Sequence, residues 1–210
     1  MASNGSLSKY KKKRDFRKTT EPGGEKKITK GAKPIFVIQK HDASHLHYDF
    51  RIEVNGVLKS WAVPKGPSTD PAQKRLAVPT EDHPLEYSTF EGVIPEGEYG
   101  AGTVMVWDTG TYQNLKNKDG KSVPMERTVR DGHIEIRLEG RKLRGAYALI
   151  RTGNGEKDSD TRWLLIKMKD NEADARRNPV SAEPNSALSN RSLDKIRKAS
   201  QKNNKGKKDD

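Results

Sequence analysis

The residues best suited to chemistry lie between His45 and Val54, where polar and apolar side chains alternate strictly. An alternation with period two is typical of a β-strand with one buried face, and it places His47, Asp49 and Arg51 together on the other face. Residues two apart on one face have Cα atoms about 6.5–7 Å apart, so an imidazole and a carboxylate can both reach one metal ion. Arg51, one step further along, could bind a phosphate whose other oxygen contacts that metal.

A metal site of this kind needs a third ligand, and His41 and His45 both lie close by in the sequence. The spacing alone does not choose between them. A lone His-x-Asp pattern is also typical of an exposed strand face whose charges pair with neighbours, but three histidines in so short a segment favour a metal site. Because the chain has no cysteine, any metal must be held by imidazole and carboxylate groups.

A second group of residues suited to phosphate chemistry lies in and after a loop rich in Pro and Gly. Cations, an imidazole and a phenol can stabilise phosphoryl charge beside a metal and move protons. Each residue taken alone is also explained by a solvated surface or a turn, so the hypothesis depends on the combination. Its members are Lys65, Arg75, Glu81, His83 and Tyr87.

The scaffold that must position these residues is predicted to be all-β. Short runs rich in β-branched and aromatic residues are separated by Gly, Pro, Asn and Asp, and we find neither an internal repeat nor a P-loop. Asn55-Gly56 predicts a two-residue type I′ hairpin. The pattern favours an antiparallel β-barrel or sandwich of about eight strands. The expected strands are Ile35–Gln39, Leu46–Val54, Val57–Val63, Leu76–Val78, Thr103–Trp107, His133–Leu138, Ala146–Arg151 and Trp163–Met168.

The net charge of +12 lies entirely in the two ends of the chain. Residues 1–33 carry 11 basic and 3 acidic side chains, residues 171–210 carry 10 and 6, and residues 34–170 carry 20 of each. We therefore expect a basic, irregular N-terminal segment (1–33), a β domain (34–170) and a basic, disordered tail (171–210), in which only Leu193–Lys198 suggests a short helix. Basic arms suit a polyanion such as DNA or RNA, although lysines also simply confer solubility.

Composition also bears on the compartment. No apolar run approaches the roughly 20 residues that span a bilayer, and the N-terminus has no signal-peptide pattern. We expect a cytoplasmic protein without a membrane partner, associated with the nucleoid when it is bound to DNA. The low mean hydropathy of −1.00 agrees with a folded domain flanked by polar arms.

Three long motifs resemble the 3′-phosphoesterase domain of bacterial DNA ligase D, a family that also occurs as small stand-alone proteins. These motifs are QKHDASHLHYDFR (39–51), SWAVPKG (60–66) and EDHPLEY (81–87). Shorter matches are EGVIP (91–95), GEYG (97–100) and Trp107-Asp108, and the resemblance runs from about Arg14 to Lys169.

The resemblance implies a role for each matched position. It implies a metal site of His41, His47 and Asp49, and it passes over His45. The residues it implies for phosphate binding and catalysis are Arg51, Arg75, His83, Lys65 and Tyr87. The supporting residues it implies are Gln39, Glu81, Arg14, Asp15 and Glu21, the last three from an N-terminal motif that reaches the site.

The activity that the resemblance implies is Mn²⁺-dependent trimming of a DNA primer-template or RNA/DNA 3′ end on a compact β-barrel, with other divalent transition metals as substitutes. The enzyme removes a terminal ribonucleoside and then the 3′-phosphate, leaving a 3′-hydroxyl for non-homologous end joining. Ku and an ATP-dependent ligase would be separate chains, because no nucleotidyl-transferase signature is present. The nucleophile is not assigned; a metal-bound water is the default.

Two other functions fit some of the same residues. One is a non-catalytic nucleic-acid-binding adaptor of a repair ligase, with an inactive histidine cluster. The other is a metal-free ribonuclease that cleaves internally, with His41 and His83 as acid and base. Activity that survives chelation would favour the ribonuclease, and inactivity in the presence of metal would favour the adaptor.

Overall fold

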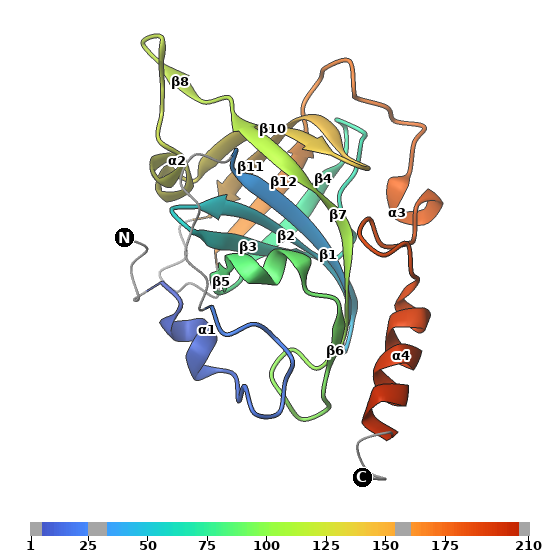
Figure 1. The fold of residues 1–210 in the computed structure, drawn as a ribbon. Helices are drawn as coiled ribbons and strands as arrows, with labels where there is room; N and C mark the ends of the chain where they lie inside the picture. Colours follow the sequence, from blue (N-terminus) through green and yellow to red (C-terminus); the bar gives the residue numbers. More distant parts are fainter. Residues whose placement is uncertain (1–5, 25–32, 154–160, 206–210) are drawn as a thin grey trace.

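The computed structural model describes residues 6–24, 33–153 and 161–205, and these are mostly β-structure (Figure 1). The strands are β1 (Ile35–Asp42), β2 (Leu46–Val54), β3 (Val57–Val63), β4 (Lys74–Pro79), β5 (His83–Pro84), β6 (Gly92–Ile94), β7 (Gly102–Asn114), β8 (Asn117–Lys118), β9 (Lys121–Ser122), β10 (His133–Gly140), β11 (Arg144–Thr152) and β12 (Arg162–Lys167). The helices are α1 (Ser8–Lys12), the 3-10 helix η1 (Leu85–Thr89), α2 (Met125–Asp131), α3 (Pro179–Ala182) and α4 (Leu193–Lys205).

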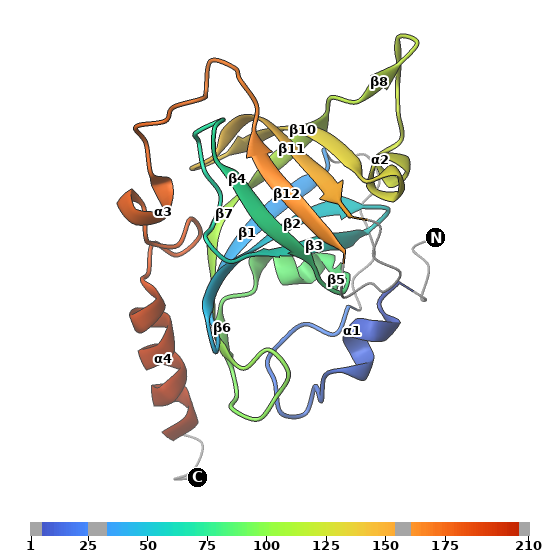
Figure 2. The same ribbon diagram turned by 180° about the vertical axis from the view of Figure 1, so that it is seen from behind.

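Eight strands form a closed antiparallel barrel in the order β1-β2-β3-β4-β12-β11-β10-β7, and β7 pairs back onto β1 (Figures 1 and 2). The short strands β5 and β6 pair with β3 and β7 outside this ring. This architecture confirms the predicted all-β fold, and it selects the barrel over the sandwich. Each of the eight predicted strands overlaps one strand of the ring.

Strand β7 is much longer than the predicted Thr103–Trp107, because its two halves pair with different neighbours. It runs alongside β1 over Thr103–Thr111 and alongside β10 over Gly110–Asn114. At Gly110 a Cβ atom would lie 2.1 Å from the carbonyl oxygen of Glu139. Only glycine fits this approach, so the residue that interrupts the apolar pattern is the one that lets the strand pass between two partners.

The β2–β3 hairpin has the predicted geometry. Asn55 and Gly56 have φ angles of 51° and 81°, and the left-handed conformation at both positions is what a type I′ turn requires. The apolar face of β2 points into the barrel, where Tyr48, Phe50 and Ile52 are buried. Burying a side chain of this size contributes about 1.5–3 kcal/mol, so the polar face of β2 is held firmly outward.

A second apolar cluster lies outside the barrel, on the outer side of β1 and β3. It consists of Tyr10, Val37, Leu58, Tyr87 and Val106, and it joins α1 and η1 to the strands. The outer face of the hairpin is therefore covered by two segments distant in sequence. The buried polar residues of this face, Gln39, Asp49 and Arg51, are enclosed between the strands and this cover.

The N-terminal segment is more ordered than its composition suggests. Residues 6–24 contain α1 and run across the outer side of β1–β3, below η1 in Figure 1. Tyr10 is fully buried, and its hydroxyl donates to the Pro22 carbonyl at 2.7 Å. This aromatic residue, surrounded by lysines in sequence, fixes the segment. The predicted irregularity of residues 25–32 falls outside the described part of the chain.

The C-terminal segment, expected to be disordered, instead packs along the barrel in the described residues 161–205. The buried indole of Trp107 donates to the Glu183 carbonyl at 2.8 Å, and Ile196 of α4 is 1% exposed. Helix α4 begins at the predicted Leu193 and continues to Lys205. The low hydropathy of this segment led to the wrong prediction, because hydropathy counts only apolar side chains. The segment packs on the barrel largely through main-chain carbonyls that accept hydrogen bonds, together with one fully buried apolar side chain of α4, Ile196.

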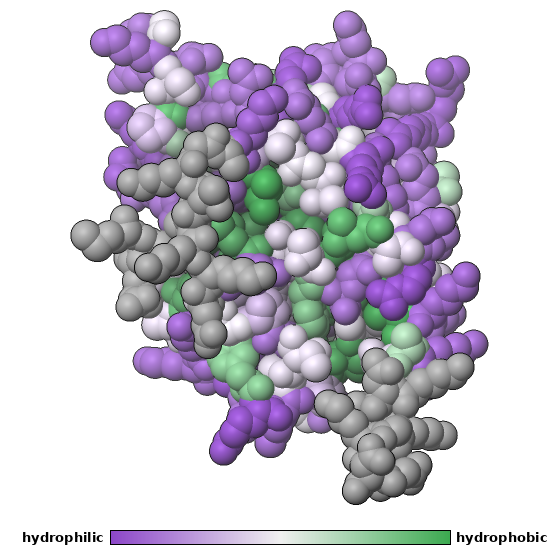
Figure 3. Space-filling model, viewed as in Figure 1, coloured by the Kyte–Doolittle hydropathy of each residue, from purple (hydrophilic) through white to green (hydrophobic). Residues whose placement is uncertain are grey.

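The molecular surface agrees with this packing. Figure 3 shows hydrophobic side chains in the middle of the visible face and hydrophilic ones around its edges. None of the helices in residues 6–24, 33–153 or 161–205 is long and apolar enough to cross a membrane.

Candidate metal and phosphate site

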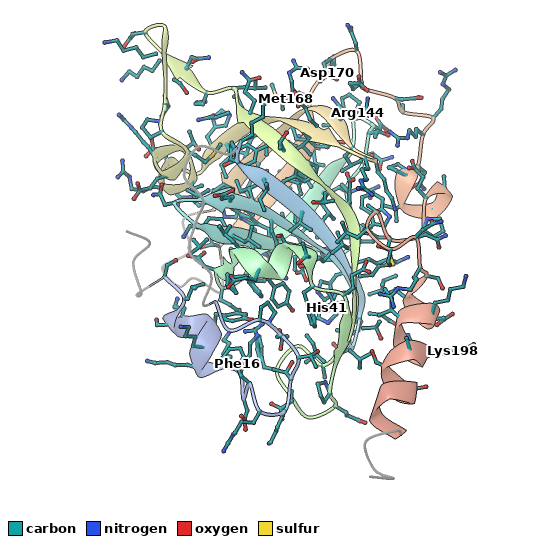
Figure 4. The ribbon with its side chains drawn as sticks, in the orientation of Figure 1. Phe16, His41, Arg144, Met168, Asp170 and Lys198 are labelled. Atoms are coloured by element: carbon teal, nitrogen blue, oxygen red, sulfur yellow. The ribbon has the colours of Figure 1, made fainter. Side chains whose placement is uncertain are left out.

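The site is built across the β1–β2 ladder. The register places Gln39 opposite Asp49 and His41 opposite His47, so four polar side chains meet on the outer face. Strand β5 adds His83, which pairs with Leu58 at the neighbouring strand β3. His41 lies where the strands come close to the loop that leads into β7 (Figure 4).

Three of these residues form a group of possible metal ligands. Donor atoms of His41, His47 and Asp49 all lie within 4.8 Å of one another. Nδ1 of His41 is 3.6 Å from one carboxylate oxygen of Asp49, and Nε2 of His47 is 3.7 Å from the other. One cation could contact all three residues with small adjustments, since metal–ligand distances are about 2.0–2.2 Å. The exposed His45 side chain is not part of this group.

The other nitrogen of each imidazole contacts a main-chain carbonyl. Nε2 of His41 lies 2.9 Å from the Gly100 oxygen, and Nδ1 of His47 lies 2.9 Å from the His45 oxygen. If each of these nitrogens carries the proton and donates it, the lone pairs of His41 Nδ1 and His47 Nε2 face Asp49. Such carbonyl partners fix the ring orientation of metal-binding histidines. His45 thus supports the site through its backbone.

The Asp49 carboxylate is kept ionised. Its burial favours the protonated form, but Arg51 and the two adjacent imidazoles outweigh burial and hold its pKa well below the ordinary value. Nη2 of Arg51 is 3.1 Å from the Asp49 carboxylate, and both side chains are almost completely buried. The carboxylate therefore keeps the charge that a metal ligand requires.

Arg51 occupies a fixed position between the candidate metal ligands and His83. Its Nε donates to Oε1 of Gln39 at 2.8 Å, and Gln39 in turn donates to the carbonyls of Tyr87 and Phe90 at 2.9 and 3.0 Å. The guanidinium is locked by hydrogen bonds on two sides and lies 5.1 Å from the ring centre of Tyr87. An arginine held in this way can bind an anion without losing side-chain entropy.

His83 is an uncharged imidazole among cations. Burial, reinforced by Arg51 and Arg14, holds its pKa well below the ordinary value. Its Nδ1 lies 2.8 Å from the Glu81 carbonyl, and its Nε2 lies 3.3 Å from Nη2 of Arg14. Nη1 of Arg51 also lies 2.9 Å from Nδ1, so a proton on Nδ1 would suit the carbonyl and Arg14, whereas a proton on Nε2 would suit Arg51.

Arg14 brings the N-terminal segment into the site. Its side chain is 4% exposed and binds Glu21 at 2.9 Å and Glu81 at 3.0 Å. The ring of Tyr10 stacks below the guanidinium, with 3.9 Å between Cζ and the ring centre. Glu21 also accepts from the Tyr87 hydroxyl at 2.9 Å. These contacts bring together the N-terminal segment, η1 and His83.

The structure does not connect every sequence-predicted residue to this cluster. Arg75 lies on β4 and donates to Gln73, Lys65 is exposed just after β3, and Asp15 pairs with Arg17 at 3.0 Å. Among the described residues, none of the three predicted side chains has a hydrogen bond or ion pair to the cluster. Their proposed roles therefore require a bound substrate.

Sequence reasoning missed several participants. Tyr10 packs edge-on against His83 with ring centres 5.1 Å apart, and Ser60 Oγ lies 3.5 Å from His83 Nδ1. The Gly100 carbonyl supports His41. Ser60 and Gly100 lie inside quoted motifs, so the motifs contained a usable signal. Tyr10 lies in a segment whose lysines obscured it.

A closed barrel with a His-His-Asp group beside buried arginines has the types of residue that a phosphoesterase uses, and comparisons with known proteins identify the family. The family model of the DNA ligase D 3′-phosphoesterase domain matches residues 39–151. The chain belongs to this family.

Curated relatives include the multifunctional non-homologous end joining protein LigD of Pseudomonas aeruginosa, 50% identical over 196 residues, which is 92% of this chain and 22% of the relative. LigD of Mycobacterium tuberculosis is 47% identical over 163 residues, covering 78% of this chain and 20% of the relative. LigD of Mycolicibacterium smegmatis is 46% identical over 167 residues, covering 78% and 21%. The chain thus spans about a fifth of the length of these relatives.

Proposed function

We propose that this chain repairs DNA 3′ ends in non-homologous end joining. As a phosphodiesterase it removes a 3′-terminal ribonucleoside, and as a phosphomonoesterase it then hydrolyses the remaining 3′-phosphate to a 3′-hydroxyl. One observation carries the proposal: the ligand group of His41, His47 and Asp49 adjoins the buried Arg51, 3.1 Å from Asp49. A metal and a guanidinium side by side suit a phosphate ester.

The proposed cofactor is Mn²⁺, with other divalent transition metals as substitutes. Two imidazole nitrogens and one carboxylate leave coordination positions open for substrate and water, and this donor set suits several first-row metals. When bound, the metal would polarise a phosphate oxygen and lower the pKa of a water molecule.

The protein's own residues supply charge and a proton. Arg51, fixed by Asp49 and Gln39, would neutralise a phosphate oxygen as charge develops. A phosphate dianion beside His83 would raise the pKa of that imidazole, so that it takes up a proton and gives it to the departing oxygen. Lys65 and Arg75 are proposed to contact the phosphate once substrate is bound, and Tyr87 holds Glu21 in place.

Ligation would need further proteins. The relatives are named for non-homologous end joining. We propose that this chain acts before an ATP-dependent ligase, with Ku holding the ends.

The assignment is tested with two histidine variants and a primer-template ending in one ribonucleotide. We expect His47→Ala to reduce both hydrolytic steps at least a thousandfold and to lower Mn²⁺ affinity, with the fold intact by circular dichroism. The matched control His45→Ala should lose less than threefold, because its side chain is exposed. Wild-type activity that persists in EDTA, or equal losses in both variants, would contradict the metal site.

His83 separates the metal from the proton transfer. We expect His83→Ala to retain Mn²⁺ but to lose phosphomonoesterase activity about a hundredfold or more, with an unequal loss of ribonucleoside removal. A monoester dianion and a diester place different demands on the imidazole. Metal content and both rates should be measured on matched primers. A metal-free variant would make His83 a ligand, and equal losses would deny it a step-specific role.

A further inference from the structure

A cavity of about 520 Å³ adjoins the phosphate site, and its lining does not include His41, His47 or Asp49. Its walls come from the N-terminal segment, β3, the turn between β4 and β5, α2 and the end of β11. Figure 2 shows α1, α2 and the ends of β4 and β11 on this side of the barrel. Ser60 and Glu81 line the cavity and also contact the His83 ring or its neighbour Arg14. The cavity and the phosphate site therefore share a wall.

The charged residues of the cavity favour an anion. Four cations line it against two carboxylates, Glu81 and Asp82. Lys13 pairs with Glu81 at 3.1 Å, and Lys59 pairs with Asp82 at 2.6 Å, so both carboxylates are already neutralised. The Arg151 side chain, by contrast, has no carboxylate partner within the described residues. The wall of the cavity thus holds more basic than acidic side chains, and among the described residues the guanidinium of Arg151 is available to a ligand.

Aromatic surface lies beside these cations. Tyr99 is 48% exposed, and Nζ of Lys13 lies 4.2 Å from its ring centre. Trp61 and Trp163 also line the cavity, with ring centres 5.5 Å apart. A nucleotide base can stack on the exposed face of the phenol ring, and the cations can pair with phosphates of the sugar-phosphate backbone. This combination is typical of grooves that bind single-stranded nucleic acid.

Other cavities of the described surface lack one of these properties. The cavity beside η1 is lined by Glu86 and Glu91 and has no cation in its wall. The cavity at the β10–β11 turn balances Arg137 and Arg144 against two glutamates and touches none of the site residues. Adjacency to His83, positive charge and an exposed aromatic ring therefore coincide in the cavity lined by Tyr99 and Arg151.

We propose that this cavity binds the nucleotides immediately 5′ of the terminal phosphate in the strand that is processed. Arg151 contacts a backbone phosphate, and a base stacks on Tyr99. The inference rests on the proposed function, since it assumes that a nucleic-acid 3′ end lies at His83. It adds a binding subsite that lets the protein recognise a strand rather than an isolated phosphate ester.

The test measures the affinity of oligonucleotides with a 3′-hydroxyl, one to six nucleotides long, by competition against a fluorescent six-nucleotide strand. Wild-type affinity should increase when the second and third nucleotides are added. Tyr99→Ala should remove most of that increase, about tenfold, whereas Tyr99→Phe should keep it because the ring face remains. Arg151→Ala should weaken binding of the longer strands and reduce the slope of log Kd against log salt by about one.

The matched control is Arg137→Ala, which removes an arginine from the β10–β11 cavity. It should leave both affinity and salt slope close to wild type. Equal effects of Arg137→Ala and Arg151→Ala would overturn the proposal, as would a Tyr99→Ala variant that retains the length dependence. Because these strands already carry a 3′-hydroxyl, binding needs no hydrolysis. A protein that shows the expected binding pattern but hydrolyses no 3′-phosphate would refute the proposed function and leave the subsite standing.

Discussion

The two arms of this protein share a basic composition and differ in what they do. Residues 6–24 place the buried Arg14 and Glu21 beside His83. Residues 171–201 pack along another side of the barrel, where the Glu183 carbonyl accepts from Trp107 and Ile196 is buried. Figure 4 shows Phe16 of the first arm below the barrel and Lys198 of the second on α4, well apart.

This difference shows that the partners of a basic segment, more than its charge, decide its role. In the first arm a guanidinium finds two carboxylates, Glu21 and Glu81, and becomes part of the site. In the second arm Arg197 pairs with Asp42 and Arg191 pairs with Glu91. Main-chain carbonyls of this arm also accept hydrogen bonds from the barrel, as the Glu183 carbonyl does from Lys142. We therefore expect damage to the first arm to affect chemistry and damage to the second to affect stability.

Among the variants that test this comparison of the two arms, Arg14→Ala is expected to have the largest effect. The substitution removes the cation that Glu21 and Glu81 share and leaves Glu81 paired with Lys13. Losing one partner of a buried pair costs about 3–5 kcal/mol. Turnover on a 3′-phosphate primer should fall at least a hundredfold while bound Mn²⁺ is retained. Steady-state rates and metal content measure this. Arg17→Ala is the control, because Arg17 is exposed and, within the part of the chain that the structure describes, forms an ion pair only with Asp15. Comparable losses of turnover in Arg14→Ala and Arg17→Ala would contradict the assignment of Arg14 to the site and of Arg17 to the surface.

The second arm is tested with Ile196→Ala. Ile196 packs against the barrel core, and truncating a buried isoleucine costs about 2–4 kcal/mol. We expect the free energy of unfolding in urea to fall by that amount, with turnover at saturating substrate within twofold of wild type at a temperature where the variant is folded. A hundredfold loss of turnover in the folded variant would show that the second arm also serves the chemistry.

The smallest effect concerns pH. The pKa of His83 lies below its unfolded value of about 6.5, so below pH 6.5 the unfolded state binds a proton that the folded state excludes. This contribution to stability is complete above pH 6.5 and is lost as the pH falls, by up to about 1.4 kcal/mol per pH unit. Urea unfolding between pH 7 and pH 5 should show it. Arg14→Ala should make the free energy of unfolding less dependent on pH, because Arg14 helps to lower the pKa of His83. Ile196→Ala should leave this pH dependence unchanged. A pH dependence that changes in Ile196→Ala and not in Arg14→Ala would contradict the assigned roles of the two arms.

The sequence by itself determined the barrel strands and the polar face of β2. Strict alternation from His45 to Val54 gave the side that faces outward, and Asn55-Gly56 gave the turn, because both are local properties of a pleated strand. The pair His47 and Asp49 followed from the same periodicity. The third candidate ligand did not, because His41 and His45 both lie close by in the sequence, and the family resemblance was needed to prefer His41.

Only the tertiary structure decided which residues lie opposite one another and what covers them. Strand register places His41 beside His47, and chain folding brings Arg14 to His83, 69 residues away in sequence. The burial of Tyr10 and the docking of α4 were equally beyond composition, since a lysine-rich segment is irregular in isolation and ordered when its few apolar groups and carbonyls find partners. Periodicity determines which side of a strand a residue occupies, but register and long-range packing depend on the summed energy of contacts between distant segments.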